Sequence, residues 1–275
     1  MSDFLGKIDD FIAALGSRFW IWFSVLSFLL IYGLIHQTNV MGWPSPDVSL
    51  RTVDSDVYIR MTKVRELIQG GSLYDHTVAA TNAPYGGIST PWTRPLDFIL
   101  IALYQFSPSD FSIEKRLLLV ANWYPLMIVS MIILMLTKAA ETGFKSVQKL
   151  GLIILCFIAD ILFNAHNYFM VGNVDHHSLQ ALLWCTTIWL LLSKPSHPSA
   201  LTLGATLGLW FWISPEALPF IFMAYGILGV KAILNPAQSY MPTLTSIAVT
   251  LTTCVGLFVE YPPDKILSTL AYDTN

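Results

Sequence analysis

The stretch Leu117–Leu136, LLLVANWYPLMIVSMIILML, holds twenty consecutive residues without one charged side chain. A helix of about 20 such residues is long enough to cross the hydrocarbon core of a bilayer, which is about 30 Å thick. The whole chain of 275 residues shares this character, with 54% hydrophobic residues, 12% charged residues and a mean hydropathy of +0.58. Soluble domains average about 25% charged residues. The sequence therefore predicts an all-α integral membrane protein.

Further apolar runs lie on both sides of this stretch, and several of them are short for a full crossing. Together they predict about seven transmembrane helices, at roughly 19–35, 117–136, 150–169, 178–192, 200–213, 217–230 and 242–259. The pair around Ser214-Pro215 is compatible with a broken or re-entrant unit. The expected organisation is a cytoplasmic segment 1–18, a transmembrane domain 19–259 with a long extracytoplasmic loop at 36–116, and an extracytoplasmic polar tail 260–275, with a truncated chain as the alternative to a complete one.

The basic residues of the short connections predict the orientation in the membrane. Seven of them fall on one side, which the positive-inside rule makes cytoplasmic: Lys7, Arg18, Lys138, Lys145, Lys149, Lys194 and Lys231. The long loop then lies on the extracytoplasmic side, and we expect a multi-pass protein of a bacterial inner membrane with a periplasmic active face. The net charge of −3 does not favour nucleic acid as a partner. The three cysteines lack the spacing of a thiolate metal site.

The long loop contains the pattern of one amphipathic helix. Asp54 is placed to cap a helix that runs to about Gln69 and ends at Gly70-Gly71. Its apolar stripe is Val57, Met61, Val64 and Ile68. A stripe of this kind on a loop between spans predicts an interfacial helix lying on the membrane.

The segment Gly172–Ser178, GNVDHHS, brings one carboxylate and two imidazoles together in an otherwise apolar chain. Asp175 and His177 are the expected ligands of a divalent cation, Mn²⁺ or Mg²⁺ rather than Zn²⁺, and His176 is left as a neighbouring polar residue. The alternative is that Asp175 is the N-cap of a helix and binds no metal. The predicted topology places Asp54, Asp56, Glu216 and Glu260 on the same face as this segment. Ionisable groups near the bilayer are functional candidates. Asp160, in the middle of the third span, is a further candidate, with a hydrogen-bonded structural role inside the bundle as the alternative.

Two arginines of the loop, Arg60 and Arg94, are candidates for gripping a phosphate. The alternative is that they pair with nearby carboxylates or with lipid headgroups. With Asp56 and Glu216 they make up the predicted substrate-binding set.

Three motifs resemble those of the GT-C class of membrane glycosyltransferases: Asp54-x-x-x-Tyr58-x-Arg60, the Asn82-Ala83-Pro84-x-Gly86 turn and Val174-Asp175-His176-His177. The nearest similarity is to the catalytic subunit of oligosaccharyltransferase, especially its archaeal form, and to related bacterial membrane proteins. The resemblance implies that Asp54, Asp175 and His177 hold a divalent ion on the diphosphate of a polyprenyl-linked sugar donor, and that Asp54 and Asp175 are catalytic. The family's Trp-Trp-Asp motif and large soluble C-terminal domain are absent from this sequence, which favours an envelope acceptor other than an asparagine of a protein.

The function expected from the sequence is therefore metal-dependent transfer of a sugar from a polyprenyl-phosphate-linked donor on the extracytoplasmic face. The alternatives are a non-catalytic membrane scaffold or lipid-binding protein with a GT-C-like fold, and a metal-dependent membrane phosphatase or transporter. Expected partners are the lipid-linked donor and membrane lipids, with a partner subunit or a missing C-terminal part as a further possibility.

Overall fold

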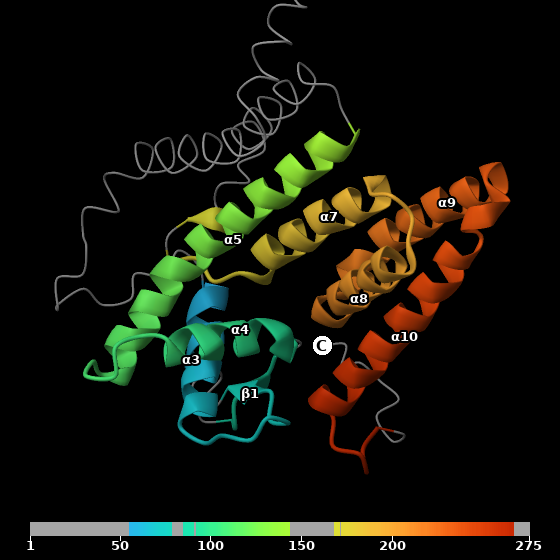
Figure 1. Cartoon of the computed structure of the whole chain (residues 1–275). Helices are drawn as coiled ribbons and strands as arrows, with labels where there is room; N and C mark the ends of the chain where they lie inside the picture. The colour runs from blue at the N-terminus through green and yellow to red at the C-terminus, as the bar shows by residue number, and fades with distance from the viewer. Residues whose placement is uncertain (1–54, 79–84, 91, 144–167, 171, 267–275) are drawn as a thin grey trace, which may run out of the picture.

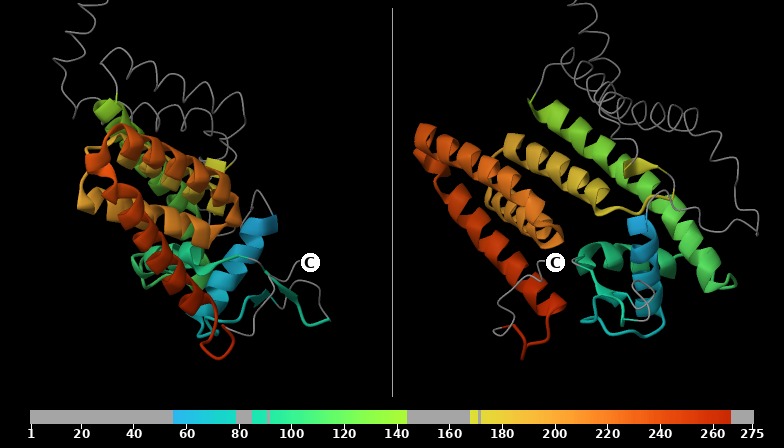
Figure 2. Two further views of the ribbon diagram at one scale, coloured as in Figure 1. Left: turned by 90° about the vertical axis from the view of Figure 1, so that its right-hand side faces the viewer. Right: turned by 180° about the vertical axis from the view of Figure 1, so that it is seen from behind.

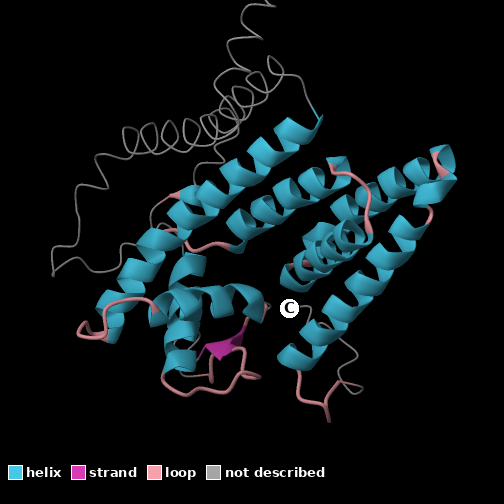
Figure 3. Cartoon of the chain, in the orientation of Figure 1, coloured by secondary structure: helices cyan, strands magenta, loops and turns pink. Residues whose placement is uncertain are grey.

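The computed structural model describes residues 55–78, 85–90, 92–143, 168–170 and 172–266. These residues are mostly helical (Figure 3). The helices are α3 (Ser55–Ile68), α4 (Arg94–Gln105), α5 (Ile113–Gly143), α7 (His176–Leu192), α8 (His197–Ile213), α9 (Leu218–Leu234) and α10 (Tyr240–Glu260). Short 3₁₀ turns, η2 (Pro215–Ala217) and η3 (Pro236–Gln238), precede α9 and α10. A small antiparallel ribbon pairs β1 (Thr77–Val78) with β2 (Ile88–Ser89).

The described helices form two groups (Figure 1). The long helices α5 and α7–α10 form a bundle, and α3, α4 and the ribbon lie together at one end of it, as the side and rear views also show (Figure 2). The helices α7 and α9 run away from the α3–α4 group, whereas α8 and α10 run back toward it (Figure 1). The starts of α7 and α9 and the ends of α8 and α10 therefore meet at one end of the bundle, beside α3 and α4.

Three of the described helical segments are long and apolar enough to cross a membrane: Ile113–Gly143, Pro215–Leu234 and Pro236–Glu260. This supports the expected all-α membrane protein, but not seven spans. Helices α7 and α8 have 17 residues each, which at 1.5 Å per residue is roughly 26 Å and short of the hydrocarbon core. The expected span 19–35 lies outside the described residues, and so do residues 150–167 of the third expected span, with Asp160.

The amphipathic helix of the loop is confirmed as α3, although its apolar stripe does not face lipid. Gly70, at φ +94°, ends the helix: the N–H of Gly70 donates to the carbonyl of Leu67, and that of Gly71 to the carbonyl of Glu66. This pair of bonds is the Schellman motif that two successive glycines favour. The stripe residues Val57, Met61 and Val64 are buried in the main core, which α4 and α5 also line. The expectation of an interfacial stripe is corrected, because the protein itself supplies the apolar surface that covers it.

Helices α8 and α10 pack along their length because glycines let their backbones approach (Figure 2). A Cβ atom at Gly204 would lie 2.3 Å from the carbonyl oxygen of Thr245, and one at Gly208 would lie 2.9 Å from the carbonyl oxygen of Val249. The hydroxyl of Thr245 donates to the carbonyl of Ala200 across the same contact, at 3.2 Å. Small residues with a cross-helix hydrogen bond are the usual packing device of membrane helices.

Candidate functional site

A turn closed by the N–H of Asn173, which donates to the carbonyl of Met170, precedes α7, and Asp175 at the start of α7 is extended. Gly172 adopts φ +88°, which glycine alone among residues adopts at little cost, and its N–H donates to the carbonyl of Ala121 in α5. The hydroxyl of Tyr124, one turn further along α5, donates to the carbonyl of Asp175 at 3.2 Å. Two hydrogen bonds thus hold the backbone before α7 against α5, and they determine the position of the Cα atom of Asp175.

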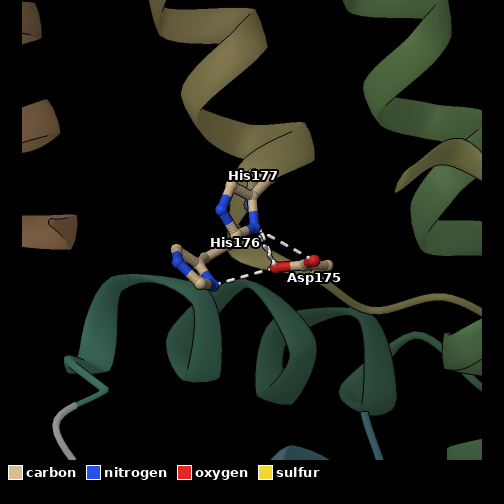
Figure 4. Close-up of side chains that lie close together, drawn as sticks. All are labelled: Asp175, His176 and His177. Carbon is tan, nitrogen blue, oxygen red and sulfur yellow. Dashed lines mark hydrogen bonds and ion pairs between the residues drawn. The ribbon is translucent and has the colours of Figure 1, made fainter. Parts of the chain in front are cut away.

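Asp175 is the N-cap of α7, as one of the two sequence interpretations predicted. Its Oδ1 accepts the backbone N–H of His177 at 3.1 Å. Both neighbouring imidazoles also contact this carboxylate, with Nδ1 of His176 and Nδ1 of His177 each 2.9 Å from Oδ1 (Figure 4). Nδ1 of His177 also lies 3.1 Å from Oδ2. Among the described residues, these three side chains form the group whose ligand atoms could hold a metal ion, all within 4.8 Å of one another.

The electrostatics of the cluster stabilise an ionised carboxylate beside protonated imidazole. Burial alone would raise the pKa of Asp175, but hydrogen bonds from His176 and His177 outweigh it and hold the pKa well below the usual value. The hydrogen bond to Asp175 raises the pKa of His177, and partial burial opposes this rise. The charges of Glu216 and Asp56 add to the rise.

A second acidic residue reaches the cluster from the turn between α8 and α9. Oε2 of Glu216 lies 3.7 Å from Nε2 of His177 and accepts a hydrogen bond from Nε2 of Gln180 at 3.1 Å. Gln180 is buried in α7, and its own Oε1 accepts the indole N–H of Trp210. Glu216 is itself 61% exposed. A buried amide therefore orients an otherwise solvent-facing carboxylate toward His177.

The spacing of the cluster fits a coordination sphere. Two ligand atoms that each lie about 2.1 Å from one ion, at right angles, are about 3.0 Å apart. The 2.9 Å separations between Oδ1 of Asp175 and the two Nδ1 atoms match this edge length, and they are also ordinary hydrogen-bond distances. One carboxylate with two imidazoles is a donor set that suits a divalent cation of the first transition row. Binding through Nδ1 requires that each of these atoms lose its proton, so the cluster couples cation binding to pH.

The predicted site residues divide into three groups in the structure. Asp175, His177 and Glu216 come together, with Asp56 near enough for its charge to act on His177. His176, which the sequence analysis left outside the ligand set, belongs to the cluster. Asp54 lies outside the described residues. Arg60 and Arg94 form the third group.

Arg60 and Arg94 are buried and pair with a carboxylate, which is the alternative that the sequence left open. Nη1 of Arg60 lies 2.9 Å from Oδ1 of Asp97, and Nη1 of Arg94 lies 3.0 Å from Oδ2. Arg94 also donates to the carbonyls of Leu73 and Asp75. The sequence analysis missed Asp97, which is 1% exposed. The sequence signal for Asp97 is its place as the fourth residue of a helix that begins at Arg94. An acidic residue in the first turn of a helix is equally typical of an exposed surface charge, so this signal does not predict burial.

No protein-family model, curated protein or solved structure matches this chain. The fold and the cluster themselves therefore define the class: a mostly helical protein with three described segments long and apolar enough to span a membrane, and with a carboxylate–imidazole cluster where its bundle meets α3 and α4.

Proposed function

We propose that this protein is a membrane enzyme that binds a divalent cation at Asp175, His176 and His177 and transfers a sugar from a polyprenyl-phosphate-linked donor to an envelope acceptor. The observation that carries the proposal is that ionisable side chains from three separate elements lie together at one end of the bundle. The start of α7 supplies the Asp–His–His cluster, the α8–α9 turn supplies Glu216 at 3.7 Å, and the start of α3 supplies the charge of Asp56. These elements are far apart in sequence.

The residues of the chain divide the work of such a reaction. A divalent ion, when bound, supplies positive charge for the departing lipid diphosphate. Asp175 holds that ion together with the two imidazoles, and Asp54, just before α3, is the proposed further ligand and activator of the acceptor. Gln180 keeps the carboxylate of Glu216 beside His177. In this proposal Arg60 holds α3 against α4 through Asp97, and Arg94 holds the loop after α3 against α4 through the carbonyls of Leu73 and Asp75, because both guanidinium groups are already engaged there.

The proposal includes a topology. Seven spans, with the segments 19–35 and 150–169 added to α5 and α7–α10, place the cluster on the extracytoplasmic side by the positive-inside rule. The alternation of α7, α8, α9 and α10 supports it, since Lys194 and Lys231 then lie at the end of the bundle opposite the cluster (Figure 1). Lys231 lies in the last turn of α9 and donates to the carbonyl of Leu191 at the end of α7.

The test is a transfer assay with the full chain in nanodiscs and a panel of polyprenyl-diphosphate sugars, in Mn²⁺ and in chelator. We expect Asp175→Ala and His177→Ala each to lower the rate by at least about a hundredfold, since removal of groups that only support metal ligands already costs 10–100-fold. His197→Ala is the matched control, because His197 stacks on Tyr240 outside the cluster. Metal-dependent transfer that survives both cluster substitutions would refute the site.

A non-catalytic role is the second candidate, and one observation favours it. The carboxylate of Asp175 already caps α7 through Oδ1, and both of its oxygens lie within hydrogen-bond distance of Nδ1 of His177. If the cluster is only a cap, Asp175→Ala should lower stability through the lost capping bond without changing the affinity of the protein for divalent ions. That outcome, with no transfer from any donor of the panel, would favour a scaffold or lipid-binding protein.

A further inference from the structure

A second pair of ionisable side chains lies apart from the Asp175 cluster, where the loop after α3 meets the end of α10. Nε2 of His76 lies 3.3 Å from Oε2 of Glu260. The side chains are 18% and 7% exposed. Nothing in the proposed function uses either residue, and the two belong to opposite groups of the fold.

The orientation of the His76 ring is set by its other nitrogen. Nδ1 lies 3.2 Å from the carbonyl oxygen of Trp92. Because a carbonyl oxygen can only accept, Nδ1 carries a proton. The backbone of His76 is held as well, since the N–H and the hydroxyl of Thr90 both donate to its carbonyl. Nε2 is therefore the nitrogen that faces Glu260, and in a neutral ring it offers only a lone pair.

The carboxylate of Glu260 is held by its other oxygen. Oε1 accepts the backbone N–H of Arg94 at 2.8 Å and the indole N–H of Trp212 at 2.6 Å. Arg94 is the first residue of α4, and its N-cap residue, Thr93, makes no side-chain capping bond. Glu260 thus caps α4 from the end of α10. Within the described residues, Oε2 is buried without a conventional hydrogen bond and faces His76.

We propose that His76 and Glu260 share one proton, and that this proton latches the loop and α4 to the ends of α8 and α10. With the proton present, either imidazolium donates to carboxylate or the carboxylic acid donates to imidazole, and both forms make one hydrogen bond between Nε2 and Oε2. Without it, two lone pairs face each other in a buried site, a state that costs the desolvation of both groups without a bond. Loss of the proton therefore opens the contact. This inference does not depend on the proposed function.

The direction of the pH dependence follows from the groups around the pair. Arg94 and Asp97, both on α4, are the charged residues that act on it, and they form an ion pair with each other at 3.0 Å. Burial lowers the pKa of His76, and the charge of Arg94 adds to this effect. The latch is closed where the pair holds its proton and opens as the pH rises. Coupled groups of this kind lose the proton with one apparent pKa that belongs to the pair.

The substitution Glu260→Gln distinguishes a contact that depends on the shared proton from one that depends only on the shape of the side chain. The side-chain carbonyl of glutamine can still accept from Arg94 and Trp212, and its amide donates permanently to Nε2 of His76. Glu114→Gln is the matched control, since Glu114 is an exposed acid at the start of α5. Two readouts are followed against pH in detergent micelles: hydrogen exchange of peptides spanning 92–97, corrected for intrinsic rates, and the ring ¹⁵N signals of His76, assigned with His76→Gln.

We expect the corrected exchange at Arg94 to rise at least about tenfold as the pH increases, in the unmodified chain and in Glu114→Gln, and to show no step in Glu260→Gln. A change of this size is that of one lost hydrogen bond. The Nε2 signal should shift at the pH of the exchange step while Nδ1 stays protonated. The proposal is overturned if the step is absent from the unmodified chain, if it is equally large in Glu260→Gln, or if His76 titrates alike with and without Glu260.

Discussion

Replacing Asp97 by alanine removes a buried carboxylate that contacts two buried guanidinium groups, and we expect a large loss of stability. The side chains of Arg60 and Arg94 are only 5% and 1% exposed, and each has one Nη1 atom about 3 Å from Asp97. Loss of one partner from a buried ion pair costs about 3–5 kcal/mol, because the remaining charge is left uncompensated. Arg60 keeps a bond to the carbonyl of Thr93, and Arg94 keeps two to other carbonyls. We therefore place the cost near the lower limit, at about 3 kcal/mol.

The assay is reversible unfolding in mixed micelles, with Asp110→Ala as the control. Asp110 is exposed in the loop before α5, where substitutions usually change stability by less than about 0.5 kcal/mol. Adding Arg60→Met to Asp97→Ala should recover part of the loss, since it removes one unpaired charge. If Asp97→Ala costs no more than Asp110→Ala, the ion-pair network does not hold α3 to α4.

Two further predictions concern helix packing and acid stability. Gly204→Ala should lower the free energy of unfolding by about 1–3 kcal/mol, because the added Cβ overpacks the contact with Thr245. Gly226→Ala, whose Cβ meets nothing within 4 Å, should be neutral or slightly stabilising. Equal unfolding free energies of the two variants would contradict this prediction. In chelator, the lowered pKa of Asp175 contributes stability that is present above its unfolded pKa of about 3.9 and lost as the pH falls through the folded value. The raised pKa of His177 contributes stability that is full below about 6.5 and lost as the pH rises through its folded value. Unfolding free energies against pH should show both losses, and Asp175→Asn should flatten both; a profile unchanged by that substitution would disprove the assignment.

Local sequence signals predicted the elements well. The four-residue stripe and Gly70-Gly71 predicted α3 to within about a residue of its bounds, because periodicity and a left-handed terminus are both local properties. The apolar runs predicted α5 and α7–α10, because an uninterrupted stretch of apolar residues is also a local property of the sequence. The Asp–His–His cluster was also visible, since its three members are consecutive.

Long-range pairings were beyond such signals. Arg60 was expected on a phosphate or, alternatively, beside a nearby carboxylate or a lipid headgroup, but no local signal identified Asp97, 37 positions away, as the carboxylate that makes its burial possible. Glu260 caps α4 across 166 positions, and no local pattern marks a cap supplied by another helix. Glu216 was predicted on the same face as Asp175, and it lies beside His177, but its orientation by Gln180 follows only from the packing of α7 against α8.

The central claim is that the cluster at the start of α7 holds a divalent cation, and direct titration of the full chain with Mn²⁺ tests it without any assumption about substrate. Calorimetry of the unmodified protein in nanodiscs should give one saturable site whose affinity rises with pH, because the ligating imidazole nitrogens must lose protons. Asp175→Ala should weaken that site by at least about tenfold, the smallest effect expected at a metal centre, and His197→Ala should leave it unchanged. Absence of the site from the unmodified protein, or equal affinity in Asp175→Ala, would contradict the account.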